Sequence, residues 1–200
     1  MLRRALVVLL LLAAPAAASD APAAGPEPPA PCPAKTFRFE APAGWQVEAV
    51  PGLPAGREAC SLVLMLDEEN VAGLMRIDAH AEPLAYAAGD DPARTIFERY
   101  RAALVAEGAL EVDLEPSWRN DTLKVAAGSP FDRASMRAYP ARRREPAIPL
   151  ELAFVTLHTP GSYYTVALIT PAQSDQPEVW DVNQAALRQV LNSFDITTAK

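Results

Sequence analysis

Histidine and carboxylate side chains alternate along one stretch of the chain in a pattern that could bind a metal ion. Asp78, His80 and Glu82 are spaced two residues apart, so an extended strand would point all three to one side. Imidazole and carboxylate groups are ligands for divalent transition metals. However, a sheet with one face in water produces the same alternation, and Arg76 on that face would offset the carboxylate charge. Same-face neighbours on one strand are also about 7 Å apart, which rarely closes a tight site. We therefore interpret this segment as the solvent-facing side of a strand and assign no metal ligand.

Serine-based catalysis would need a nucleophile beside a base, and the chain has only two histidines, His80 and His158. No serine lies in a G-x-S-x-G turn, and the chain contains no H-E-x-x-H, P-loop or G-x-G-x-x-G motif. The sequence therefore predicts no catalytic residues and no cofactor. The serines that could be nucleophiles are Ser61, Ser129, Ser135 and Ser162.

Cys32 and Cys60 are the two cysteines of the chain. In an exported protein, an even number of cysteines favours a disulfide. This bridge would close a loop of roughly 28 residues and stabilise the fold by about 3–4 kcal/mol by restricting the unfolded chain. The alternative is two free thiols, with Cys60 buried as a small apolar residue.

The beginning of the chain has the order of a secretory signal peptide. Two arginines precede an apolar run over 5–14, and an A-x-A site ends at Ala18. The run is too short for a transmembrane helix, and the rest of a twin-arginine signal is missing. We expect Sec-type export, cleavage near Ala18, and a periplasmic or secreted protein. Residues 19–34 are rich in proline and alanine and predict a flexible tether.

Charged and aromatic residues leave two binding hypotheses open. The net charge of −7 argues against a nucleic-acid partner. Residues 67–70 predict a solvated hairpin tip. Residues 142–144, three consecutive arginines, predict an exposed loop, although they could bind an acidic partner. Several aromatic residues could line a binding groove, although aromatic residues usually serve the core; they are Trp45, Trp118, Trp180, Tyr163 and Tyr164.

The elements that must position these residues follow from hydrophobic periodicity. Two helices are predicted, over 92–107 with Asp91 as N-cap, and over 176–193 with Asp175 in a capping box. The apolar stripe of the second helix runs from Val179 through Val182 and Leu187 to Phe194. Strands are predicted around 37–39, 45–49, 61–66, 70–82, 110–114, 122–126, 134–139, 150–158 and 162–170. This pattern favours a single α+β domain over 35–200, in which two main helices pack on a twisted, mostly antiparallel sheet.

The chain resembles the Mog1/PsbP/DcrB-like family in three local features. These are the Pro-Ala-Gly-Trp segment at 42–45, the helix end at 100–104, and the strand at 162–170 followed by the helix end at 187–194. The resemblance spans about residues 35–197. It implies an accessory or binding protein, with no shared catalytic set.

We therefore expect an exported, non-enzymatic accessory or protein-binding module of the bacterial cell envelope, with an envelope protein as partner. The alternative is a periplasmic carrier of a small ligand or metal. A concave apolar pocket of several hundred Å³ with convergent polar groups would favour the carrier. A flat surface with a contiguous apolar patch would favour the partner-binding module.

Overall fold

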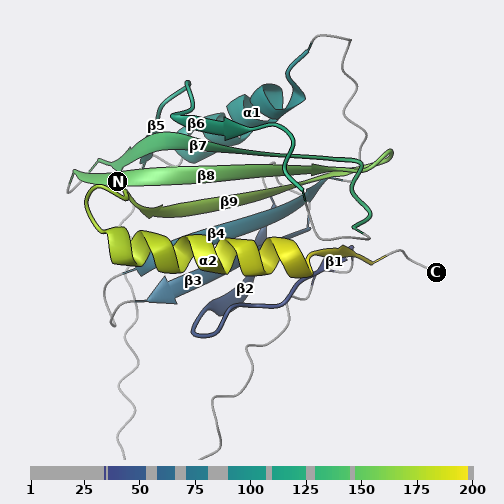
Figure 1. Cartoon of the computed structure of the whole chain (residues 1–200), viewed down its shortest axis with the longest axis horizontal. Coiled ribbons are helices and arrows are strands. Elements are labelled where there is room, and N and C mark those ends of the chain that lie inside the picture. The colour runs from purple at the N-terminus through teal and green to yellow at the C-terminus, as the bar shows by residue number, and fades with distance from the viewer. Residues whose placement is uncertain are drawn as a thin grey trace, which may run out of the picture.

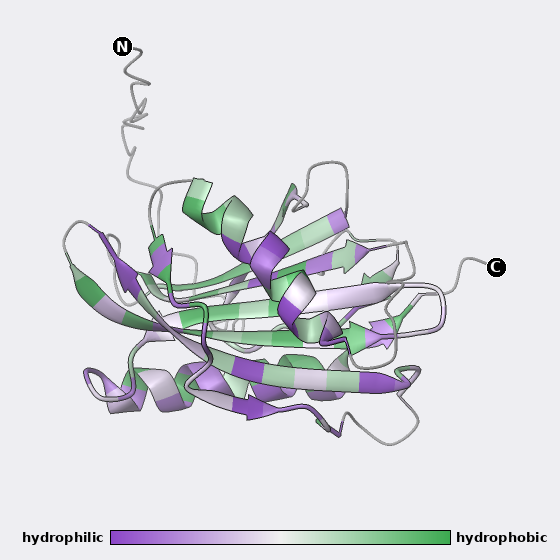
Figure 2. Ribbon diagram, turned by 90° about the horizontal axis from the view of Figure 1, so that it is seen from above, coloured by the Kyte–Doolittle hydropathy of each residue, from purple (hydrophilic) through white to green (hydrophobic). Residues whose placement is uncertain are grey.

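The computed structural model is an α+β fold in which a large antiparallel sheet separates two helices (Figures 1 and 2). It describes residues 34, 36–52, 58–65, 71–80, 90–106, 110–124, 129–144 and 147–197. Within these ranges, the main sheet has the order β2-β3-β4-β9-β8-β7-β5, and β6 also pairs with β7. The predicted fold class is confirmed.

The strands follow the predicted alternation, with bounds that differ at their ends. A two-stranded ribbon, β1 with β10, lies beside the main sheet and pairs Phe37 with Ile196. The predicted strands around 150–158 and 162–170 form a hairpin, in whose turn the Thr159 amide donates to the Ser162 carbonyl at 2.9 Å. The strands are β1 (Phe37–Arg38), β2 (Gln46–Pro51), β3 (Glu58–Met65), β4 (Val71–His80), β5 (Leu110–Val112), β6 (Trp118–Asn120), β7 (Arg133–Arg143), β8 (Ile148–His158), β9 (Tyr163–Pro171) and β10 (Asp195–Ile196).

The two helices are α1 (Pro92–Ala106) and α2 (Pro177–Ser193). Asp91 caps α1 as predicted, because its Oδ1 accepts a hydrogen bond from the Arg94 amide at 3.0 Å. The capping box predicted at Asp175 is wrong. Gln176 is the N-cap residue of α2 and makes no side-chain capping bond; Pro177 at the first turn removes one amide that a cap would otherwise satisfy.

Two loop and strand predictions also need correction. Instead of a strand over 122–126, the described residues form a strand earlier, at β6. After β6, the Asn120 Oδ1 accepts a hydrogen bond from the Thr122 amide at 3.1 Å, and such a local turn competes with strand pairing. The arginines at 142–144 are not all in a loop, since Arg142 and Arg143 lie in β7. That strand continues past Pro140 because β5 and β8 pair with it on both sides.

One face of the sheet forms an apolar core beneath α2. Leu62, Met75 and Leu168 are fully buried there, and Leu187 of α2 packs against them. The helix comes close to the sheet at Gly73, where a Cβ atom would lie 2.7 Å from Asn183 Oδ1. A side chain at position 73 would therefore push α2 away from the sheet.

The apolar stripe predicted for α2 is wrong at one position. Val182 is 55% exposed, whereas Asn183 is fully buried. The Asn183 Nδ2 donates to the Ala72 carbonyl and to Thr170 Oγ1, each at 2.8 Å. These two hydrogen bonds satisfy the Asn183 amide nitrogen, whereas its Oδ1 is buried without a hydrogen-bond partner in the described part of the chain. With Asn183 directed at the sheet, Val182 points toward solvent.

The opposite face of the sheet carries α1, and the interpretation of 74–82 as a solvent-facing strand is wrong for Asp78 and His80, which are buried on that face. Asp78 is fully buried and His80 is 4% exposed. Asp78 accepts hydrogen bonds from Arg76 at 2.9 and 3.1 Å, which stabilise its charge. The apolar part of this face is a cluster of α1 with β7, β8 and β9, in which Phe97 stacks on Tyr139 with ring centroids 3.5 Å apart.

Several sequence predictions lie outside the described residues. They include the signal peptide over 1–18, all but the last residue of the tether over 19–34, the tip at 67–70, Glu82 and Cys32. Cys60 is described and is fully buried in β3, opposite Ala49 and Ile77. Its predicted disulfide with Cys32 stays a prediction. In the described part of the chain, no helix is long and apolar enough to cross a membrane.

Candidate functional site

An apolar groove runs between α2 and the strands β6 and β7, with a volume of about 480 Å³. We call it the tryptophan groove, because Trp118 of β6 and Trp180 of α2 both line it. Figure 1 shows the framework, with α2 across the sheet and with β7 and β6 to one side of it, beyond β9 and β8. The other lining residues are Leu123, Met136, Ala138, Glu151, Gln173, Gln184, Leu187, Arg188 and Leu191.

The groove exists because α2 covers the central strands of one sheet face and does not cover β7 on the same face. The helix packs on β9 and β4. Met136 and Ala138 of β7 point to this face and line the groove beside α2. Leu187 and Leu191 of α2 form the apolar wall opposite.

Trp118 is placed at the groove by strand register, and Trp180 is oriented there by a hydrogen bond. The β6–β7 register pairs Trp118 with Ala138, so both side chains lie on the same face. Trp118 remains 50% exposed. Trp180 is half-buried and its indole Nε1 donates to Glu151 Oε1 at 2.8 Å. This hydrogen bond satisfies the polar atom of Trp180 and fixes its ring orientation.

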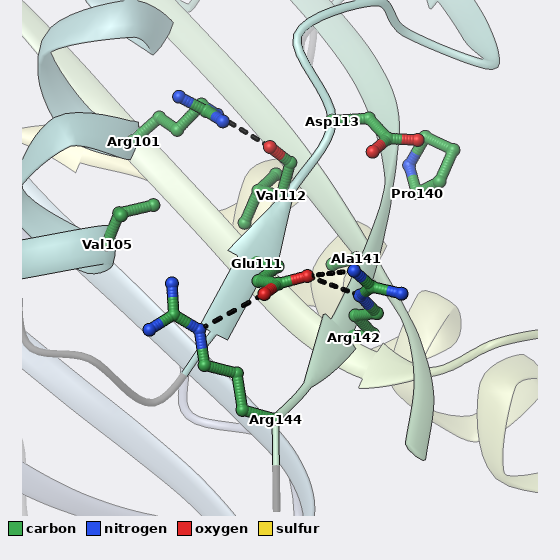
Figure 3. A pocket seen from close by; sticks show the side chains of 9 residues that line it. All are labelled: Arg101, Val105, Glu111, Val112, Asp113, Pro140, Ala141, Arg142 and Arg144. Atoms are coloured by element: carbon green, nitrogen blue, oxygen red, sulfur yellow. Dashed lines mark hydrogen bonds and ion pairs between the residues drawn. The ribbon is translucent and has the colours of Figure 1, made fainter. Parts of the chain in front are cut away.

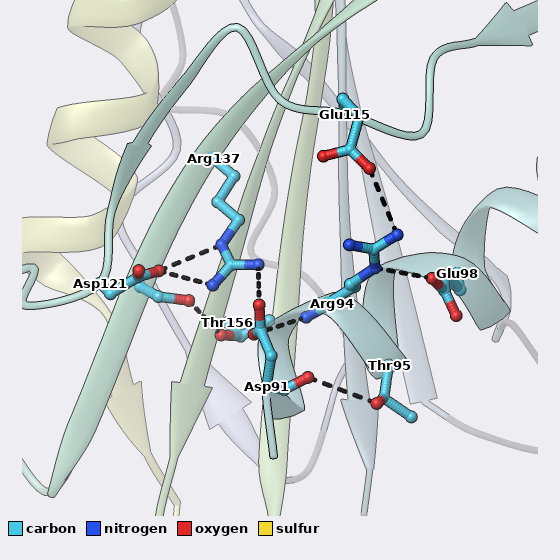
Figure 4. Close-up of polar contacts among 9 residues, drawn as sticks. Asp91, Arg94, Thr95, Glu98, Glu115, Asp121, Arg137 and Thr156 are labelled. Atoms are coloured by element: carbon cyan, nitrogen blue, oxygen red, sulfur yellow. Dashed lines mark hydrogen bonds and ion pairs between the residues drawn. The ribbon is translucent and has the colours of Figure 1, made fainter. Parts of the chain in front are cut away.

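On the other face, an ion-pair cluster fixes the β6 region relative to α1 (Figure 4). Arg137 of β7 is 7% exposed at its side chain and contacts Asp91 and Asp121, each at 2.7 Å. Asp91 caps α1, and Asp121 directly follows β6. One guanidinium therefore links the start of α1 to the end of the strand that carries Trp118.

The electrostatics of this cluster favour the charged forms. Burial acts to raise the pKa of Asp91, but the hydrogen bonds from Arg137 and the Arg94 amide outweigh it, so the pKa lies below 3.8. Burial likewise acts to lower the pKa of Arg137, but its bonds to Asp91 and Asp121 raise it above the ordinary value. The cluster is thus a structural ion-pair network with its charges matched by hydrogen bonds.

The structure divides the five aromatic residues singled out in the sequence. Trp45, Tyr163 and Tyr164 are each 3% exposed and belong to the core. Trp118 and Trp180 line the groove. The polar neighbours of Trp118, Ser117 and Arg119, do not mark it as exposed, because polar residues also flank buried strand residues. Nothing local indicated that Trp118 and Trp180 would line the same groove.

Both histidines lie beside Tyr163, and two of the four candidate serines bond to threonine hydroxyls. His80 and His158 lie on either side of Tyr163, with ring centroids 4.1 and 6.1 Å from it. Ser135 Oγ bonds to Thr156 Oγ1 at 2.8 Å, and Ser162 Oγ to Thr159 Oγ1 at 2.8 Å. Among the residues that the structure describes, no three histidine, cysteine or acidic side chains are placed to share a metal ion.

Comparisons with known proteins identify the fold. No protein-family model matches the sequence, and no curated protein matches it. Cyanobacterial PsbP (CyanoP) from Synechocystis sp. PCC 6803 is similar in structure, with a TM-score of 0.50 and 15% identity over 80% of this chain and 86% of that one. The Ran-binding protein Mog1p of Saccharomyces cerevisiae has a TM-score of 0.51 and 9% identity over 80% of this chain and 90% of that one. A mutant of Mog1 has a TM-score of 0.51 and 10% identity over 82% of this chain and 92% of that one. The chain therefore has a Mog1/PsbP-like fold, as the sequence resemblance implies.

Proposed function

We propose that this protein is a non-enzymatic accessory module of the bacterial cell envelope that binds a partner protein through the tryptophan groove. The observation that carries the proposal is the pair of indole rings at the open apolar groove, one of them half exposed. Tryptophans at well-packed, partly apolar sites supply a large share of binding energy in protein interfaces. The occupant is a segment of a partner protein that inserts an aliphatic or aromatic side chain beside Trp118.

A protein partner is also in keeping with the fold. Mog1p, which has a similar fold, is a Ran-binding protein. For the present chain this likeness supports protein binding as a class of function and leaves the identity of the partner to experiment.

The groove can be tested by photo-crosslinking in an envelope extract of the native host. A photoreactive amino acid in place of Trp118 should crosslink to one partner, and Trp118→Ala should reduce capture of that partner about tenfold, as expected for a hot-spot residue. Val182→Ala is the matched control, because Val182 is an exposed apolar residue of α2 outside the groove. Equal capture by wild type and Trp118→Ala would refute the groove as the docking site. A crosslink to a second copy of the chain would identify self-association instead.

A small-ligand carrier remains the second candidate because of the size of the groove. A volume of about 480 Å³ lies within the 300–1,000 Å³ typical of ligand pockets. Native mass spectrometry of protein purified from the host distinguishes the two functions. A stoichiometric small molecule that Trp118→Ala loses, without a protein crosslink, would favour the carrier.

The envelope location rests on the signal peptide. Protein isolated from the native host should begin at or near Ser19, as measured by mass spectrometry, and a full-length cytoplasmic product would contradict export. Cys32 and Cys60 should resist alkylation until the protein is reduced and unfolded. Rapid alkylation of both in native protein would exclude the disulfide.

A further inference from the structure

A second cavity, of about 570 Å³, lies between the C-terminal half of α1, β5 and the end of β7 (Figure 3). We call it the arginine cleft. It shares no lining residue with the tryptophan groove. The lining residues are Arg101, Val105, Glu111, Val112, Asp113, Pro140, Ala141, Arg142 and Arg144.

Arg101 forms the α1 wall of the cleft. Its side chain is half-buried, and its Nε donates to the Val112 carbonyl at 2.6 Å. Its guanidinium forms no ion pair with the residues that the structure describes, unlike the paired arginines 38, 76, 94, 137, 142 and 144. A partly desolvated cation without a counter-charge favours binding of an anion.

The opposite wall already holds a carboxylate. The β5–β7 register pairs Glu111 with Arg142, and these two side chains form an ion pair. Arg144 Nε lies 3.3 Å from the other Glu111 oxygen. Two guanidiniums thus share one carboxylate, and Figure 3 shows the terminal nitrogens of Arg144 directed away from Glu111.

The charges of the cleft contrast with the rest of the molecule. Three arginines face two carboxylates, Glu111 and Asp113, so the lining is net positive in a chain whose net charge is −7. Val105, Pro140 and Ala141 add apolar surface beside these arginines. That mixture suits a flexible chain carrying carboxylates on methylene stems better than it suits a compact inorganic anion.

We propose that the arginine cleft binds an acidic segment of a protein, with a carboxylate of that segment paired to Arg101 and a second carboxylate paired to Arg144. The inference is independent of the tryptophan groove, because a different surface and a different kind of contact carry it. On this proposal the tryptophan groove binds an apolar side chain and the arginine cleft binds an acidic segment.

The test is fluorescence anisotropy with a fluorescein-labelled peptide of alternating glutamate and alanine, added to the mature protein at low ionic strength. Arg101→Gln keeps a hydrogen-bond donor but removes the charge, and should weaken binding about tenfold, the value of one lost charge-assisted hydrogen bond. Arg144→Gln, at an exposed side chain, should weaken it similarly. Arg99→Gln is the matched control, since Arg99 is an exposed residue of α1 outside the cleft.

Each outcome decides the proposal. Weakening by both cleft variants but not by Arg99→Gln, with unchanged thermal unfolding, supports it. Undetectable binding, or equal binding by all variants, overturns it. Displacement of the peptide by inorganic phosphate at the same molar concentration also overturns it and identifies a small-anion site. Trp118→Ala should leave peptide binding unchanged, which separates this result from the fate of the tryptophan groove.

Discussion

The two faces of the sheet are stabilised by different chemistry. Beneath α2 the contacts are mostly apolar, and a few polar ones, among them the Asn183 hydrogen bonds to Ala72 and Thr170 and the Trp180 bond to Glu151, fix where the helix lies. Beneath α1 an aromatic cluster around Phe97 adjoins a band of buried polar groups that includes Asp78, His80 and Arg137. Apolar contacts are not directional, so α2 can pack on the centre of the sheet and leave a groove beside β6 and β7. The α1 face is held by directional ion pairs and hydrogen bonds, which fix the strands that border the groove.

The largest effect is expected from the aromatic cluster of the α1 face. Phe97→Ala removes a fully buried ring that stacks on Tyr139 and contacts Phe154. We expect the free energy of unfolding to fall by about 3–5 kcal/mol, as for other buried phenylalanines. Urea denaturation measures this change. A loss below about 0.5 kcal/mol would mean that α1 does not contribute a core on this face.

The matching test on the α2 face is Gly73→Ala. The added Cβ would overlap the Asn183 amide and would have to displace it from Ala72 and Thr170. Overpacking combined with strained hydrogen bonds should cost about 2–4 kcal/mol in urea denaturation. Gly161→Ala is the control, because nothing lies within 4 Å of a Cβ at that position. Equal stability of the two variants would show that α2 adjusts freely and that its position is not fixed by Asn183.

The directional contacts of the α1 face are tested by Arg137→Gln. This change leaves Asp91 and Asp121 without their cation and should cost about 1–2 kcal/mol of unfolding free energy, the range for hydrogen bonds to charged groups. Arg94→Gln removes only exposed ion pairs with Glu98 and Glu115 and should cost less than about 0.5 kcal/mol. If the free energy of unfolding falls by the same small amount in both variants, the Arg137 cluster does not distinguish the two faces.

The smallest expected effect is a pH dependence from His158. Burial, with a contribution from Arg133, lowers the pKa of His158 below 6.5 in the folded protein, and Asp132 opposes that shift. The unfolded chain therefore binds a proton first, so this contribution to stability is complete above about pH 6.5 and is lost as the pH falls toward the folded pKa. Unfolding free energies at pH 7.5 and 5.5 should differ less in His158→Gln than in wild type.

The same measurement has an internal check. Asp132→Asn removes the carboxylate that raises the pKa of His158, so the difference between pH 7.5 and 5.5 should become larger than in wild type. An unchanged pH dependence in both variants would show that His158 does not contribute to the acid sensitivity of the α1 face.

Local signals predicted local structure well. The Asp91-Pro92 pair predicted the start of α1, because capping depends only on neighbouring residues. Alternation predicted β4 and β9, and a change to helical period predicted α2. Asp175 fails as a cap because the actual N-cap is one residue later, a boundary that a capping pattern alone does not resolve.

The sequence by itself determined the α+β class, the order of the main elements and the apolar residues of most of them, because periodicity and turn chemistry act over a few residues. Only the tertiary structure decided that Asp78 and His80 are buried, on the sheet face that also carries α1. A strand pattern indicates polarity but not which distant segments pack on it. Tertiary structure also decided that Trp118 and Trp180 line one groove and that Arg101 and Arg144 line one cleft. These pairs depend on strand register and on the position of each helix, both of which are set by packing of the whole sheet.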